Sequence, residues 1–135
     1  MPVLLDLLFR RIRSLAIVLG MVTAMPAASV RVACLGDSLT AGAKVQAATE
    51  AYPIQMKAIL GPDYDVKNFG RSGATLWHGG TPHAAQQLPA VREFNPNIAV
   101  VIFGANDVRS RDADYWSHFS EFEHDLTRLL DSLLA

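Results

Sequence analysis

Three short polar segments carry the residues whose types could do chemistry. Ser38 follows a Gly-Asp pair at the end of the apolar run 30–35. A serine hydroxyl is a candidate nucleophile for acyl transfer, but it needs a base to activate it and donors to stabilise the oxyanion. Gly73 offers a backbone N–H that no Cβ shields, and Asn106 offers an amide that does not titrate. Together with the Ser38 N–H, they make three candidate oxyanion donors.

Each of these segments follows a run that is typical of a β-strand. The predicted strands are 30–35, 65–69 and 98–103, and the last is a continuous β-branched and aromatic run, IAVVIF, which favours burial on both faces. In a parallel sheet the carboxyl ends of the strands lie at one edge, where ligands bind in open α/β sheets. Taken singly, each segment is also a common turn composition. Their coincidence after three successive strands favours an active site.

The segments between the strands predict helices and a loop. We expect a loop over 36–46, a helix over 50–60 that buries Tyr52, Met56 and either Ile59 or Leu60, and a helix that starts at Thr81-Pro82 and is kinked or restarted at Pro89. A last helix over 117–134 would bury one apolar side, formed by Phe119, Phe122, Leu126, Leu129, Leu130 and Leu133. The order β-α-β-α-β-α predicts a parallel sheet with right-handed crossovers and helices on both faces.

The three polar segments also carry a family resemblance. GDSLT at 36–40, NFGRSGAT at 68–75 and GAND at 104–107 resemble the first three conserved blocks of the GDSL, or SGNH, hydrolases. The resemblance covers nearly everything after residue 28. It implies a flavodoxin-like three-layer α/β/α fold, in a family of esterases, lipases and carbohydrate deacetylases.

The resemblance also assigns roles to residues. It implies that Ser38 is the nucleophile and that Gly73 and Asn106 are oxyanion donors. The residues expected to support them are Gly36, Asp37, Asn68, Gly104 and Asp107. The stretch from Tyr52-Pro53 through NFGRSGATL is similar to the bacterial branch of sialate-type and other sugar O-acetylesterases. It therefore implies small acyl esters, acetyl groups on carbohydrate, as substrate, with Arg71 and Trp77 as first candidates for substrate contacts.

The general base is missing from the pattern. The family's fourth block, Asp-x-x-His, does not occur, because none of the four histidines has an aspartate three residues before it. Glu121 and His124 form Glu-x-x-His on the last helix, where a solvated helix face is expected and where two ligands are too few for a metal site. We therefore expect the N-terminal portion of a longer enzyme, about three of five strands, with crippled catalysis and an exposed apolar edge at strand 98–103.

The expected esterase needs no metal or organic cofactor, and transfer of acetyl to another acceptor is a variant of its reaction. Two other functions remain open. The first is a non-catalytic SGNH-like module that binds carbohydrate and lacks the base. The second is a flavodoxin-like protein that binds a nucleotide or phosphate, and such a site would need a cation near glycine N–H groups. Lys44 and Arg71 are the only cations near these loops, and neither has a recognisable spacing.

Composition and the first residues bear on location and partners. A net charge of −1 gives no sign of a nucleic-acid partner. The single cysteine, Cys34, excludes an internal disulfide and is predicted to be a small buried side chain. Residues 1–28 place arginines before the apolar run 15–24 and small residues after it, which is typical of a secretory signal peptide. We expect a periplasmic or secreted domain over 29–135, with an uncleaved membrane anchor as the alternative. The oligomeric state stays open.

Overall fold

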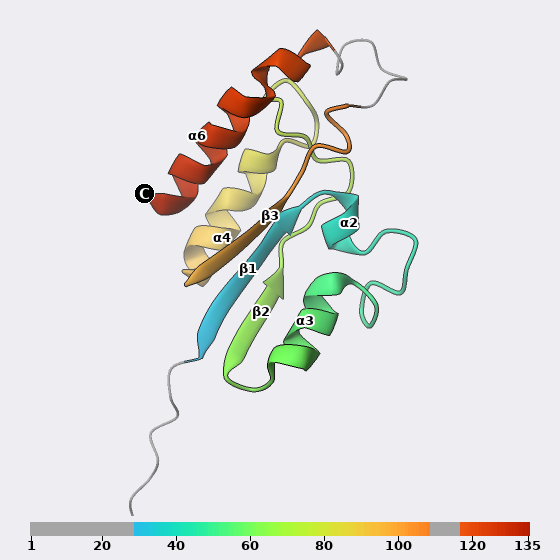
Figure 1. Cartoon of the computed structure of the whole chain (residues 1–135), viewed down its shortest axis with the longest axis vertical. Coiled ribbons are helices and arrows are strands. Elements are labelled where there is room, and N and C mark those ends of the chain that lie inside the picture. The colour runs from blue at the N-terminus through green and yellow to red at the C-terminus, as the bar shows by residue number, and fades with distance from the viewer. Residues whose placement is uncertain (1–28, 109–116) are drawn as a thin grey trace, which may run out of the picture.

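The structure is a computed structural model that describes residues 29–108 and 117–135, so the predicted signal peptide lies outside the described residues. Its centre is a parallel sheet of three strands in the order β2-β1-β3 (Figure 1). The strands are β1 (Val30–Gly36), β2 (Tyr64–Asn68) and β3 (Ile98–Ile102). Cys34 pairs with Asn68 on one side, and Gly36 pairs with Ile102 on the other. This register brings the three carboxyl ends to one edge, as the sequence predicts.

Helices cover both faces of the sheet. Their bounds are α2 (Ser38–Ala41), α3 (Tyr52–Leu60), α4 (Leu88–Phe94) and α6 (Phe122–Leu134), with 3-10 turns η1 (Ala84–Gln87) and η2 (Phe119–Glu121). Helix α3 lies on one face, and α4 and α6 lie on the other (Figure 1). The predicted α/β class and the helical cover on both faces are therefore confirmed. No described helix has the length and apolar character needed to cross a membrane.

The core divides along β1, whose alternate side chains enter opposite layers. On the α3 face, Val32, Cys34 and Val66 pack against Tyr52 and Met56. On the other face the buried residues form two clusters, Ala33, Leu35, Val91 and Phe94 in one and Leu76, Ala84, Leu88 and Leu129 in the other. Because β1 is buried on both faces of the sheet, the polar loop that carries Ser38 begins at a rigid strand.

The expected burial of β3 on both faces is wrong for the described residues. Ile98 and Ile102 are 47% and 38% exposed. Within residues 29–108 and 117–135, β3 pairs only with β1 and forms one edge of the sheet. This agrees with the exposed apolar edge predicted for that strand.

The burial of single helix residues also differs from the prediction. Ile59 is 83% exposed, and Leu60 is exposed as well, because the packed face of that helix is formed by Tyr52 and Met56. Phe119 and Leu130 are exposed too. Phe119 falls in η2, before α6 begins, and so departs from the helical spacing that would place it on the packed face.

Two predictions about where helices begin are wrong, each for a local reason. The expected loop over 36–46 contains α2, which the buried Asp37 side chain caps by accepting a hydrogen bond from the Leu39 N–H. Thr81-Pro82 does not start a helix, because the Pro82 carbonyl accepts a hydrogen bond from the Thr75 N–H, and helical structure begins only at Ala84. The predicted restart at Pro89 is confirmed, since this proline occupies the first turn of α4.

Candidate active site

Ser38 stands at the point where β1 turns into α2. It is the first residue of that helix and is half-buried, directly after the fully buried cap residue Asp37. A Cβ on Gly36 would overlap the Thr40 side chain and the Ile102 carbonyl, so only glycine allows the chain to pass this close. The serine is therefore held by a capped helix start and by a glycine that has no room for a side chain.

The second polar loop is fastened to this turn. The Asn68 Nδ2 donates to the Thr40 carbonyl at 2.8 Å, and its Oδ1 accepts from the Gly70 N–H at 2.8 Å. The Arg71 N–H donates to the Gly36 carbonyl at 2.9 Å. Asn68 thus links the exit of β2 to α2, which is a structural reason for an asparagine at this position.

The third loop is in turn fastened to the second. The buried Asn106 donates from Nδ2 to the Ala74 carbonyl at 2.9 Å. Asp107 accepts the Leu76 and Trp77 N–H groups on Oδ1, each at 2.9 Å. Gly73, the neighbour of Ala74, has a φ of +83°, a conformation that favours glycine. The Asn106 amide is therefore fastened one residue beyond Gly73, and within the described residues only one acceptor is bonded to its Nδ2, which carries two N–H groups.

Sequence reasoning missed a residue that belongs to this region. Gln87, buried in η1, donates from Nε2 to the Gly36 carbonyl at 3.0 Å, and its Oε1 accepts from the Gly36 N–H at 3.4 Å. It therefore braces the residue two positions before Ser38. It lies outside all three polar segments, and 51 residues separate it from its partner, so local sequence gives no signal for it.

The region is electrostatically unusual because it buries carboxylates. Burial raises the pKa of Asp107, the hydrogen bonds from the Trp77 and Leu76 N–H groups oppose this rise, and the nearby Asp125 carboxylate adds to it. The second carboxylate oxygens of Asp37 and Asp107 have no hydrogen-bond partner within the described residues. Burying polar groups is costly, so their concentration at one edge of the sheet marks a specialised site.

No histidine is hydrogen-bonded to Ser38, although all four lie in the described part of the chain. His83 contacts the Leu76 carbonyl through Nε2 at 3.0 Å, and His118 contacts Glu121 at 2.9 Å. His78 lies 3.9 Å from Asp125, and His124 is exposed. Of the Glu-x-x-His motif, Glu121 therefore lies in η2 and contacts His118, while His124 lies in α6 with an exposed side chain.

The remaining predicted residues lie in the same loops and have partners of their own. The Arg71 guanidinium donates to Gln86 at 2.8 Å on the surface. The Trp77 ring stacks on His118, with ring centroids 4.2 Å apart. Gly104 has a φ of +116°, and a Cβ there would press on the Phe122 ring at 3.3 Å. Gly104 thus fits a close approach between β3 and α6, while Arg71 and Trp77 stay predictions as substrate contacts.

The fold and these loops define an α/β protein with a serine and two amide donors on interlocked loops at the carboxyl edge of a parallel sheet. The model of the GDSL-like lipase/acylhydrolase family matches residues 34–135. The chain belongs to this family.

Individual relatives give the same assignment. The chain is 35% identical over 108 residues to an acetylxylan esterase of Xylanibacter ruminicola, a match that covers 78% of this chain and 22% of that protein. It resembles the crystal structure of AlinE4, described as an SGNH-hydrolase family esterase, and a mutant of it, with a TM-score of 0.63 and 25% identity. That match covers 82% of this chain and 56% of AlinE4, so the chain spans just over half of this relative and about a fifth of the other.

Proposed function

We propose that the protein to which this chain belongs is a serine ester hydrolase with Ser38 as its nucleophile. The Ser38 Oγ attacks the ester carbonyl carbon, and the carbonyl π electrons move to oxygen. The Ser38 N–H, the Gly73 N–H and the second N–H of Asn106 stabilise that oxyanion. Collapse of the tetrahedral intermediate expels the alcohol, and water then hydrolyses the acyl-serine to release the acid.

One observation supports this proposal most strongly. The Asn106 side chain donates to the carbonyl of Ala74, the residue after Gly73, so the loops that carry these two proposed donors are fastened to one another before substrate binds. Donors that need no reorganisation are what transition-state stabilisation requires.

The Ser38 proton needs a general base, and the contacts described above join none of the four histidines of this chain to Ser38. We propose that a histidine oriented by an aspartate, the pair implied by the resemblance to SGNH hydrolases, acts in the whole protein. Activity should therefore be measured on the product of the complete gene.

Acetyl groups on carbohydrate are the proposed substrate class. The support is the similarity to a protein named acetylxylan esterase and the resemblance of 52–76 to sugar O-acetylesterases. The exposed Arg71 and the half-buried Trp77 flank the Gly73 peptide in the chain and are the proposed contacts to the sugar. The basic and apolar pattern of residues 1–28 supports export to the periplasm or medium.

The test is acetate release from acetylated xylan by the complete gene product, with 4-nitrophenyl acetate and 4-nitrophenyl octanoate as chain-length probes. We expect acetate release, a preference for the acetyl ester, and a fall in kcat of about 10³-fold or more in Ser38→Ala. Ser120→Ala, an exposed serine of η2, is the control and should keep full activity. Unchanged hydrolysis in Ser38→Ala would contradict the proposal.

A second candidate is a non-catalytic module that binds carbohydrate, and the observation that favours it is that, within the described residues, no histidine is hydrogen-bonded to Ser38. It predicts that the complete protein binds acetylated xylo-oligosaccharides in calorimetry and releases no acetate. It also predicts that Ser38→Ala leaves the affinity unchanged.

A further inference from the structure

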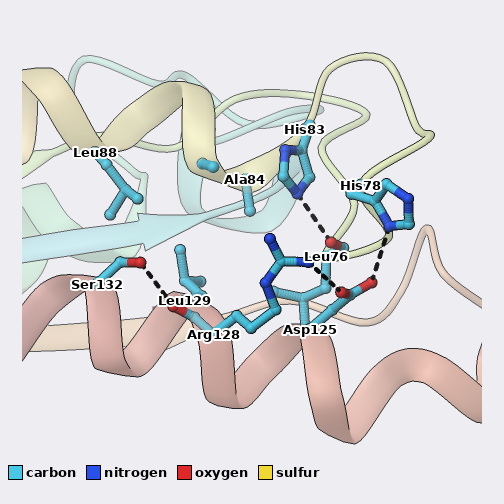
Figure 2. Close-up of a pocket in the computed structure, with 10 residues that line it drawn as sticks. Leu76, His78, His83, Ala84, Leu88, Asp125, Arg128, Leu129 and Ser132 are labelled. Carbon is cyan, nitrogen blue, oxygen red and sulfur yellow. Dashed lines mark hydrogen bonds and ion pairs between the residues drawn. The ribbon is translucent and has the colours of Figure 1, made fainter.

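A second cluster of polar side chains lies between the loop after Gly73 and the start of α6. His78 comes from that loop, Glu121 from η2 and Asp125 from α6. One nitrogen or carboxylate oxygen from each lies within 4.8 Å of the other two. Figure 2 shows Asp125 between His78 and Arg128 at the margin of a cavity of about 80 Å³. Neither Ser38 nor Asn106 lines this cavity.

Asp125 is the member of the cluster that needs explanation. It is only 6% exposed, and its Oδ2 has no hydrogen-bond partner within the described residues. The His78 Nδ1 lies 3.9 Å from that oxygen, which is too far for a hydrogen bond, and the Arg128 Nη1 lies 4.0 Å from Oδ1. A buried carboxylate oxygen without a hydrogen bond is costly unless a cation compensates for it. Asp107, another buried carboxylate, feels the charge of Asp125 and increases that cost.

We propose that His78, Glu121 and Asp125 bind one divalent transition-metal ion, for which Zn²⁺ is the best match. An imidazole nitrogen with two carboxylate oxygens is a ligand set that Zn²⁺ accepts, with water as a fourth ligand, whereas Mg²⁺ prefers oxygen ligands alone. Bonds of about 2.0–2.2 Å require the ligand atoms to approach to about 3.4 Å of one another. The His78 and Glu121 side chains are 61% and 43% exposed, so rotation can close that gap without disturbing the core.

The surroundings of Glu121 also suit a ligand. The His118 Nδ1 lies 2.9 Å from the Glu121 Oε1, and the Trp77 ring stacks on His118. Such outer hydrogen bonds orient carboxylate ligands in metal sites and leave the other oxygen for the ion. Arg128 opposes binding through its charge, but its side chain is 64% exposed and can turn towards solvent.

A bound ion would join two parts of the chain that the Ser38 site depends on. His78 follows the peptides of Leu76 and Trp77, which Asp107 already binds, and Asp125 belongs to α6. The ion would therefore hold the loop that contains Gly73 against α6 and stabilise the folded state by mass action. This role is structural and independent of ester chemistry.

The test is a Zn²⁺ titration of the untagged full chain, treated first with a chelator, in competition with a chromophoric zinc indicator. We expect one equivalent per chain and a higher melting temperature with Zn²⁺. His78→Gln and Asp125→Asn should each weaken binding at least tenfold. His124→Gln and Glu123→Gln change exposed side chains on the same helix and should bind Zn²⁺ as the unmodified chain does.

Three results would overturn the proposal. They are the absence of stoichiometric Zn²⁺ binding at micromolar concentration, equal binding by His78→Gln, and equally tight binding of Mg²⁺. His78→Gln alters an exposed side chain and should fold normally. It therefore decides the matter even if Asp125→Asn is too unstable to isolate.

Discussion

The two ends of the sheet use the same residue types in opposite ways. At the carboxyl end, Asn106 is buried and its amide joins two loops. At the amino end, Asn97 accepts the Arg31 N–H at 2.9 Å on the surface. Gly73 and Gly61 have nearly equal φ values, +83° and +81°, yet a Cβ on Gly61 would meet nothing within 4 Å.

The difference shows where the fold places its costly polar groups. Most of the buried polar residues, including Asp37, Thr40, Gln87 and Asp107, lie in or against the loops at the carboxyl end. The turns at the amino end close the chain with exposed bonds that water could replace. A fold that needed only to connect strands would not bury these groups, so the carboxyl end is the place to look for chemistry.

The largest difference between the two ends is expected for the asparagines. In the complete gene product, Asn106→Ala removes a proposed oxyanion donor and should lower kcat by about 10²–10³-fold. Asn97→Ala should leave kcat unchanged and cost at most about 1 kcal/mol of stability, because its bond is exposed. Steady-state kinetics alongside urea unfolding measure both. Similar kinetics for the two variants would remove the distinction between the ends.

The glycine pair separates backbone strain from catalysis. Gly73→Ala and Gly61→Ala should each cost about 1–3 kcal/mol, since both force alanine to adopt a positive φ. Only Gly73→Ala moves a proposed oxyanion N–H, so only its kcat should fall, by about ten- to a hundredfold. Thermal unfolding and ester hydrolysis of both proteins provide the comparison. A loss of activity in Gly61→Ala as large as that in Gly73→Ala would show that strain alone explains the effect.

Two neighbouring glutamines test how strongly the carboxyl end is braced. Gln87→Ala removes the side-chain partner of the Gly36 N–H and carbonyl, and should destabilise the fold by about 1–3 kcal/mol. Gln86→Ala loses only an exposed contact with Arg71 and should change stability by less than about 0.5 kcal/mol. Chemical denaturation of the chain distinguishes them. Equal denaturation midpoints for the two variants would mean that the Gln87 side chain does not stabilise the fold.

The smallest effect concerns Tyr52, which joins the α3 face to α2 through a 3.4 Å contact with Thr40. Burial raises the pKa of Tyr52 from 10.0 to about 12. Between these two values the unfolded chain is ionised and the folded chain is not, so stability is complete below pH 10 and falls as the pH rises towards 12. Tyr52→Phe should flatten that decline and change stability at pH 7 by less than about 1 kcal/mol. An unaltered pH profile would count against the assignment.

The sequence predicts the elements that depend on local pattern. The runs at 30–35 and 98–103 become β1 and β3 almost to the residue, and the polar loops follow them as expected. Helix α2 was missed because four residues are too few to show periodicity, although Asp37 and Gly42 at its ends are recognisable capping residues.

Contacts between distant residues could not be predicted in the same way. Gln87 reaches Gly36 across 51 residues, and His78 approaches Asp125 from a loop with no periodic pattern. The burial of β3 was misjudged because a run of β-branched residues reports what a strand favours, not which neighbours cover it. Such features depend on how the layers pack and become visible only in the folded chain.

The most direct test of the central claim is to map the adduct that a fluorophosphonate forms on the complete gene product. The reagent captures serines that a base activates, and peptide mass spectrometry identifies the residue. We predict a single adduct on Ser38, absent from Ser38→Ala and formed more slowly in Asn106→Ala. An adduct on another serine, or none on a folded protein that binds acetylated xylo-oligosaccharide, would contradict a Ser38 esterase; the second result would favour the binding module.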